Sequence, residues 1–264
     1  MILIGTSGFS YKDWVGVLYP ENTKSADMLE FYARIFPSVE LNFTYYQMPS
    51  RRTIEGLVRK VPDDFEFCVK ANKAMTHEID GNEEPGIQRA TFDAFMDALK
   101  PMTDRGVLGC ILAQFPWSFK KTQSNTEYVL QFKDLLSDVA VVVEFRNAGW
   151  ISDETFDLLR SYDLAFCAVD EPRLPGLVPP IAEATSDLGY IRFHGRNAKK
   201  WWKHSHPGER YDYLYSEAEL NEWIPKIQNV ADKTKKTYVF FNNCHSGQAA
   251  DNARMLQAML GLEL

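Results

Sequence analysis

The segment VVVEFRNAGW, residues 141–150, begins with three valines and then carries a glutamate and an arginine. A continuous run of β-branched residues is typical of a strand covered on both faces, as in a parallel sheet. Side chains alternate along a strand, so Glu144 and Arg146 share one face and Phe145 lies on the other. The segment therefore predicts a buried strand that ends with an acid and a base side by side.

Seven further apolar runs have the same character, and they lie at residues 1–5, 38–43, 65–71, 109–115, 164–170, 190–195 and 237–243. Between them, stretches with apolar residues at helical spacing occupy residues 25–36, 91–102, 126–136, 152–162, 216–227 and 248–260. Ser152 is placed to cap one of these helices, and Ser216 with Glu219 matches a capping box. Strands and helices therefore alternate along the whole chain.

Eight such units in 264 residues predict an α/β fold, a single (β/α)8 TIM barrel spanning residues 1–264. A doubly wound open sheet is the alternative. That fold usually has a glycine-rich phosphate-binding turn after an early strand, and GTSGFS at residues 5–10 does not match it. Four prolines within residues 171–188 predict an irregular connection between the sixth and seventh strands.

The composition narrows the class of protein. The chain is 45% hydrophobic and 25% charged, and its net charge of -7 gives no general attraction to nucleic acid or to an anionic membrane. The four cysteines form no C-x-x-C motif. The N-terminal residues do not match a signal peptide, and no apolar run in the sequence is long enough to predict a membrane span. We therefore expect a cytoplasmic protein with no membrane partner. The oligomeric state is left open.

Polar side chains recur near the ends of the predicted strands, where a TIM barrel builds its active site. The set comprises Glu40, Asn42, Lys70, Asn72, Gln114, Glu144, Arg146, Asp170, Arg192, His194, Asn242 and Asn243. Burial of any of these charges alone would be costly, so we expect them to pair or to remain in contact with water. Two interpretations follow: an ion-pair network that closes the barrel, or a polar cavity with acid/base groups.

The functional interpretation assigns catalytic roles to Glu144, His194, Lys70, Glu40 and Asp170. His194 titrates near neutral pH if its pKa is unperturbed, and Lys70 among other cations could become a base or an imine nucleophile. The same acids with His194 could instead bind a metal, but each acid has a cation nearby. We therefore expect neither a metal nor another cofactor.

The loop HGRNAKKWWKHSHPGER, residues 194–210, is rich in cations and contains two tryptophans. Loops after the seventh strand of a TIM barrel often bind phosphate, so Arg196 and Trp201 are candidate ligand-binding residues. Cations with aromatic rings also suit single-stranded nucleic acid. A solvated loop with its tryptophans packed on the barrel is the structural alternative.

The motifs GTSGFSYKDWVGVLYP, FPSVELNFTYYQMP, FEFCVKANKAMTH, LAQFPWSF, VEFRNAGW, YIRFHGR and FFNN follow one another along the whole chain. Together they resemble the YecE-like family, also called domain of unknown function 72. The resemblance implies a TIM barrel and no established activity. The positions that it marks as important are Gly5, Thr6, Ser7, Gly8, Trp14, Glu40, Asn42, Tyr45, Tyr46, Lys70, Thr76, His77, Gln114, Pro116, Glu144, Arg146, Trp150, Arg192, His194, Gly195 and Asn242. CHSG at residues 244–247 departs from the pattern, so we assign no nucleophile to Cys244.

The leading hypothesis is a metal-independent enzyme that uses acid/base chemistry on a small polar or phosphorylated substrate. Glu144 and His194 would exchange protons while Arg146 and Arg192 hold the anion. The expected substrate-binding set is Arg146, Arg192, Ser7, Asn42, Tyr45, His77, Gln114, Arg196, Trp201, Asn242 and Asn243. The alternatives are an endonuclease-like barrel that binds nucleic acid and a barrel that binds a ligand without catalysis.

Overall fold

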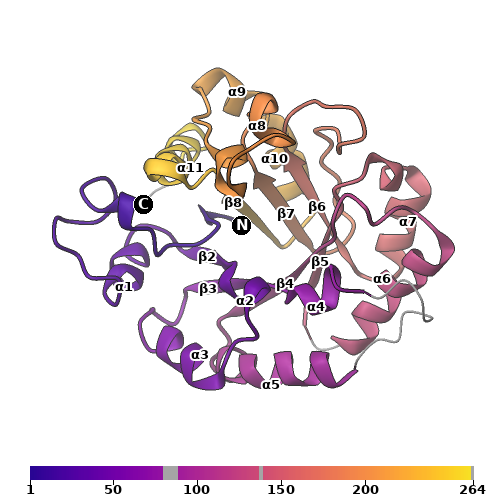
Figure 1. The fold of residues 1–264 in the computed structure, drawn as a ribbon, viewed down its shortest axis with the longest axis horizontal. Helices are drawn as coiled ribbons and strands as arrows, with labels where there is room; N and C mark the ends of the chain where they lie inside the picture. Colours follow the sequence, from indigo (N-terminus) through magenta and orange to yellow (C-terminus); the bar gives the residue numbers. More distant parts are fainter. Residues whose placement is uncertain (80–88, 137–138, 263–264) are drawn as a thin grey trace.

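The structure is a computed structural model that describes residues 1–79, 89–136 and 139–262. Its eight parallel strands lie in the middle of the molecule with the helices around them (Figure 1). The strands are β1 (Ile2–Thr6), β2 (Ser38–Leu41), β3 (Glu66–Lys70), β4 (Leu108–Gln114), β5 (Val141–Glu144), β6 (Ala165–Asp170), β7 (Leu188–Phe193) and β8 (Lys236–Phe241). From β2 to β8 each strand pairs with the next in the chain, and β8 pairs with β1. An isolated parallel bridge between Ser7 and Glu40 links β1 to β2, so the predicted (β/α)8 barrel is confirmed.

The α-helices are α1 (Met28–Tyr32), α2 (Phe43–Tyr46), α3 (Arg51–Val58), α4 (Lys73–Thr76), α5 (Arg89–Arg105), α6 (Gln123–Leu135), α7 (Asp153–Ser161), α8 (Ala198–Trp201), α9 (Glu217–Asn221), α10 (Ile224–Ala231) and α11 (Gln248–Met259). Short 3-10 helices are η1 (Lys12–Trp14), η2 (Ala148–Trp150), η3 (Pro207–Tyr211) and η4 (His245–Gly247). Both predicted caps are present: Ser152 accepts the Thr155 N–H, and Ser216 forms a capping box with Glu219.

The predicted helix over residues 216–227 is two helices, α9 and α10. Pro225 lies in the first turn of α10, where its missing N–H leaves no hydrogen bond unmade. The same residue would disrupt a continuous helix, because it cannot donate to the preceding turn. Residues 171–187 form neither helix nor strand, as their prolines predict.

Buried side chains form two separate layers. The larger layer lies between the sheet and the helices and includes Phe145, Phe193 and Trp223. The smaller layer fills the barrel interior and includes Val142, Cys167 and Val169. Alternation along each strand assigns its residues to one layer or the other, which decides the side chains that reach the site. No helix among the described residues is both long enough and apolar enough to span a bilayer.

Candidate functional site

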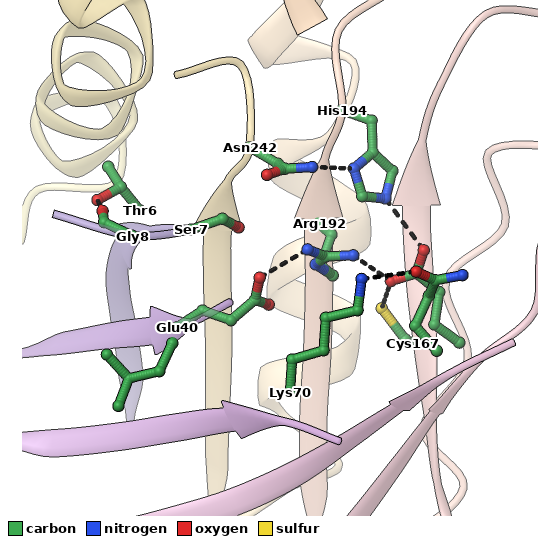
Figure 2. Close-up of polar contacts among 12 residues, drawn as sticks. Thr6, Ser7, Gly8, Glu40, Lys70, Cys167, Arg192, His194 and Asn242 are labelled. Atoms are coloured by element: carbon green, nitrogen blue, oxygen red, sulfur yellow. Dashed lines mark hydrogen bonds and ion pairs between the residues drawn. The ribbon is translucent and has the colours of Figure 1, made fainter. Parts of the chain in front are cut away.

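Three charged side chains from three strands meet inside the barrel, and we call Glu40, Arg192 and Glu144 the buried ion cluster. Figure 2 shows Glu40 and Arg192 facing each other. The guanidinium of Arg192 lies between the two carboxylates, with Nη2 2.6 Å from Glu40 Oε1 and Nη1 bonded to Glu144 Oε2. Tyr190 donates its hydroxyl to the other oxygen of Glu40 at 2.7 Å. Although burial raises the pKa of Glu144, Arg146 and Arg192 hold it well below its usual range.

His194 lies beside this cluster and is fully buried. Burial, together with the neighbouring Arg146, lowers its pKa well below the usual range, so the ring is neutral at pH 7. Asn242 Nδ2 is 3.1 Å from Nδ1, and Glu144 Oε1 is 3.2 Å from Nε2. Arg146 Nη2 lies 3.0 Å from the same Nε2, and a guanidinium can only donate, so Nε2 of the neutral ring accepts from Arg146 and the ring proton is on Nδ1, facing the Asn242 amide. His194 therefore helps to hold Arg146 in position beside Glu144.

Next to the cluster, a pocket of about 340 Å³ opens at the carboxyl ends of the strands. Its walls contain three cations, Lys70, Arg146 and Arg210. Six aromatic side chains surround them: Tyr45, Tyr46, Trp117, Trp201, Trp202 and Tyr211. Among the described residues, no carboxylate lines this pocket. Its volume falls in the range of small-molecule sites.

Lys70, the last residue of β3, reaches this pocket. Its Nζ donates to the side-chain oxygen of Gln114 at 2.7 Å and lies 4.3 Å from the centre of the Tyr45 ring. Within the described ranges, no carboxylate lies at ion-pair distance from it. Burial, followed by the positive charges of Arg192 and Arg146, lowers the pKa of Lys70 to about 7. Near neutral pH the side chain is therefore present both as an ammonium and as a free amine.

The two arginines of the pocket differ in their partners. Arg146 forms ion pairs with Glu144 and, through Nη1 at 3.0 Å, with Glu171 Oε2. Arg210 lies against the Trp201 and Tyr211 rings and contacts His204 Nε2 at 3.1 Å. No ion pair joins Arg210 to a carboxylate in the part of the chain that the structure describes. The pocket therefore contains two cations, Lys70 and Arg210, that have no acidic partner among the described residues.

Glu171 was missed by the sequence analysis, which placed Asp170 at the rim instead. Cys167 and Val169 face the barrel interior, so alternation brings Glu171 to the inner side and Asp170 to the helices. Burial raises the pKa of Glu171 to about 7, although the adjacent Arg146 lowers it. Its carboxylate also accepts the Val178 N–H at 3.1 Å, which connects Arg146 to the irregular segment. The alternation from Cys167 and Val169 is the signal that identifies this residue.

Three other predicted site residues lie on the outer side of the barrel. Asp170 binds Arg196 through two bonds of 2.9 and 2.8 Å, together with Tyr215 and Trp223. Asn243 donates to Tyr213 O and to Asn252. The structure therefore does not bring Asp170, Arg196 or Asn243 to the pocket, because each is on the helix-facing side of its strand or in the loop beyond it.

The remaining predictions divide between the pocket wall and the buried interior. Tyr45, His77, Gln114 and Trp201 line the pocket. The side-chain oxygens of Ser7 and Asn42 are buried and have no hydrogen-bond partner. Trp117, Arg210 and Tyr211 line the pocket without having been predicted as site residues; only Arg210 carried a signal, as one cation of the basic loop. Within the described ranges, no group of three His, Cys, Asp or Glu side chains is arranged to hold a metal ion.

Comparison with known proteins gives consistent matches over the whole chain. The family described as protein of unknown function DUF72 matches residues 3–264. The UPF0759 protein YunF of Bacillus subtilis is 32% identical over 273 residues, which cover 100% of this chain and 96% of that protein. A DUF72 family crystal structure from Thermotoga maritima has 42% identity and a TM-score of 0.90, with 99% of each chain covered. One from Enterococcus faecalis has 26% identity and a TM-score of 0.89, with 100% of this chain and 97% of that chain covered.

Proposed function

The chain belongs to the DUF72 family, as its motifs predicted, and because that family's description names no activity we propose a function from the site itself. In this proposal the protein is an enzyme that binds a small anionic substrate, for example a phosphorylated one, in the pocket beside the buried ion cluster. It carries out acid/base chemistry there without a metal. Lys70 is the group that exchanges protons with the substrate, and Arg146 and Arg210 bind the anion.

The observation that carries this proposal is a pair of cations that have no acidic partner within residues 1–79, 89–136 and 139–262. Lys70 and Arg210 line one pocket, although the protein as a whole has a net charge of -7. A partly enclosed cation is costly to keep without a counter-charge, so an anionic ligand would stabilise both side chains. Arg146 adds a planar guanidinium, which suits bidentate contact with phosphate or carboxylate.

The chemistry assigned to Lys70 follows from its surroundings. A general acid or base works best when its pKa is near the working pH, and burial among cations gives Lys70 a pKa of about 7. Glu144 and His194, which the sequence analysis placed in proton transfer, are fully buried and do not line the pocket. In this proposal they fix the position of Arg146 and hold Arg192 beside Lys70. The carboxylates that could bind a metal are already neutralised by guanidinium groups.

Binding measured by thermal shift and calorimetry tests the proposal. The ligands are inorganic phosphate, several sugar phosphates and the corresponding neutral sugars. We expect the phosphates to raise the melting temperature of the native protein and the neutral sugars to have little effect. Arg210→Met should lose most of this response, whereas Arg59→Met, which removes an exposed arginine elsewhere, should keep it. An equal response to neutral sugars, or an unchanged response of Arg210→Met, would contradict the proposal.

Turnover is then followed by phosphorus and proton NMR with each ligand that binds. Loss of turnover in Lys70→Met, with the fold intact by circular dichroism, is the expected result. Recovery of every bound ligand unchanged after long incubation would favour the alternative of a ligand-binding barrel without catalysis.

A nucleic-acid-binding barrel is the second candidate, and one feature favours it. Trp117 and Trp202 are exposed at the pocket with ring centres 6.0 Å apart, and Lys120 lies 3.1 Å above Trp117. Against this, Lys200 in the basic loop pairs with Glu209. A gel-shift series with single- and double-stranded DNA separates the two candidates. Binding that is strong at low salt and weakens steeply as salt increases would favour nucleic acid.

A further inference from the structure

We propose that Lys70 is a nucleophile that forms an imine with the carbonyl carbon of a small phosphorylated aldehyde or ketone. This inference rests on the proposed function for the binding of the phosphate. It goes further by naming the substrate class and a covalent step, in which the proton that Lys70 gives to the substrate is the one that passes from its nitrogen to the carbonyl oxygen. In Figure 2, Lys70 extends from β3 toward Arg192 of the buried ion cluster.

The first argument is the geometry at the amine. Gln114 Nε2 donates to the Phe115 carbonyl at 2.8 Å, which fixes the amide so that its oxygen faces Lys70. The hydrogen bond to that oxygen uses one N–H of Lys70 and leaves the nitrogen lone pair free in the neutral form. The Tyr45 ring also contacts the amine, with its centre 4.3 Å from Nζ. The amine is therefore held in place by contacts that do not consume its nucleophilic electron pair.

The second argument is the set of charges that face the amine. The positive charges of Arg192 and Arg146 disfavour a further positive charge on Lys70. Glu144 and Glu40 are also near, but both bind Arg192, so neither is a free counter-ion for Lys70. His77, whose pKa burial and Lys70 lower to about 4, remains neutral at pH 7. A desolvated lysine among cations is a known way to obtain a reactive amine at neutral pH.

The third argument is the neighbourhood of the anion site. Arg146 and Arg210 line the same pocket of about 340 Å³ as Lys70. A ligand that fills this volume and has its phosphate on the arginines would present the rest of its short carbon chain to the amine. A phosphorylated aldehyde or ketone has both an anion for the guanidinium groups and an electrophilic carbon for Lys70.

The step balances without an oxidant or another reactant. The lone pair of the neutral amine forms a C–N bond, and the π electrons move to the carbonyl oxygen. A proton passes from nitrogen to this oxygen to give a carbinolamine. A further proton from solvent lets the hydroxyl leave as water, so an iminium ion remains on Lys70. The positive charge then draws electrons from the adjacent carbon, which makes its proton easier to remove.

Borohydride trapping with peptide mass spectrometry tests the inference. Native protein is incubated at pH 7 with dihydroxyacetone phosphate or glycolaldehyde phosphate, reduced with sodium borohydride and digested. The control ligands are unphosphorylated dihydroxyacetone and glycolaldehyde. We expect the reduced adduct on the Lys70 peptide to form at least about tenfold faster than on other lysines, because far more free amine is present there. Lys236, which is partly buried and paired with Glu66 at the start of β8, is the internal control.

Two variants separate a failure of this inference from a failure of the proposed function. Lys70→Arg keeps a positive charge but cannot form an imine, so it should retain phosphate binding by thermal shift and lose the adduct. Lys70→Met should lose the adduct and weaken binding. Phosphate binding with no adduct on Lys70 above the level at Lys236 would overturn the imine and leave the anion site in place. Absence of both binding and adduct would overturn the proposed function as well.

Discussion

Asp170 and Glu171 are neighbours at the end of β6, and they lie on opposite sides of the barrel wall. Asp170 accepts four hydrogen bonds, two from Arg196 and one each from Tyr215 and Trp223. Glu171 accepts one bond from Arg146 and one from the Val178 backbone. Both oxygens of the outer carboxylate are thus fully hydrogen-bonded, by side chains that connect β6 to the surrounding loops and helices. The inner one is less fully bound, and its pKa is raised to about 7.

The cations on the outer and inner sides of the barrel wall also differ in how many carboxylate partners they have. Arg196 outside the barrel pairs with Asp170 and Glu222, whereas Lys70 and Arg210 at the pocket have no carboxylate partner among the described residues. A charge with a full set of partners stabilises the fold. A buried charge with an incomplete set costs stability, and its retention is typical of a functional site. This contrast supports our proposal that the outer charges stabilise the fold and that the pocket on the inner side is the functional site.

The largest effect is expected on the outer side. Asp170→Asn removes the charge that Arg196 requires and leaves fewer acceptors for the buried donors of Tyr215 and Trp223. We expect the free energy of unfolding to fall by roughly 3–5 kcal/mol, as when one partner of a buried pair is removed. Denaturant unfolding measures it. The control Asp157→Asn, at an exposed ion pair with Arg160, should cost less than about 1 kcal/mol. Equal losses of unfolding free energy in the two variants would contradict the structural role that we give to the carboxylate on the outer side of the barrel.

A smaller effect is expected from the pH dependence of Glu171. The folded protein keeps the carboxyl proton up to a pH of about 7, whereas the unfolded chain loses it near the ordinary value of 4.5. The contribution of Glu171 to stability is therefore complete below pH 4.5 and is lost as pH rises through about 7. Relative to Glu171→Gln, the native protein should lose roughly 3 kcal/mol over this range, at about 1.4 kcal/mol per pH unit.

Unfolding in denaturant at several pH values from 4.5 to 8 measures this difference. Glu154→Gln, which removes an exposed glutamate of α7, should show no such trend. A stability difference that stays constant with pH would show that Glu171 is ionised throughout, like an ordinary ion-pair partner of Arg146.

The smallest expected change is a gain. Lys70→Met replaces a desolvated cation by an apolar side chain of similar length, so we expect stability at pH 6 to rise by about 1 kcal/mol. Above pH 7 the folded protein holds Lys70 as the neutral amine while the unfolded chain keeps the proton up to about pH 10.5, so the native protein gains about 1.4 kcal/mol per pH unit and the advantage of Lys70→Met should reverse by pH 9. Unfolding at pH 6 and pH 9 checks both parts. A loss of stability at pH 6 would mean that the contacts with Gln114 and Tyr45 outweigh the cost of the charge.

Local patterns predicted much of this structure. The eight apolar runs became the eight strands, because a continuous β-branched run requires cover on both faces. Alternation placed Glu144 and Arg146 on one face, and the two form an ion pair. The caps at Ser152 and Ser216 were predicted correctly, since each depends on atoms only three residues apart. The continuous helix predicted over residues 216–227 was wrong, because Pro225 cannot donate a hydrogen bond to a preceding turn and instead lies in the first turn of a second helix.

The sequence by itself determined the strands, their order along the chain and the alternation of side chains between the two faces of each strand, because these depend on covalent geometry and short-range spacing. It did not determine which charges meet. Glu40 and Arg192 are 152 residues apart and touch only because the barrel closes. Arg210 reaches the pocket of Lys70 only because the long loop after β7 folds back over the barrel. Packing of Arg210 against Trp201 and Tyr211 holds it there. In the part of the chain that the structure describes, Lys70 has no acidic partner, and this too is decided by the tertiary structure, since whether a charge is paired depends on every strand around it.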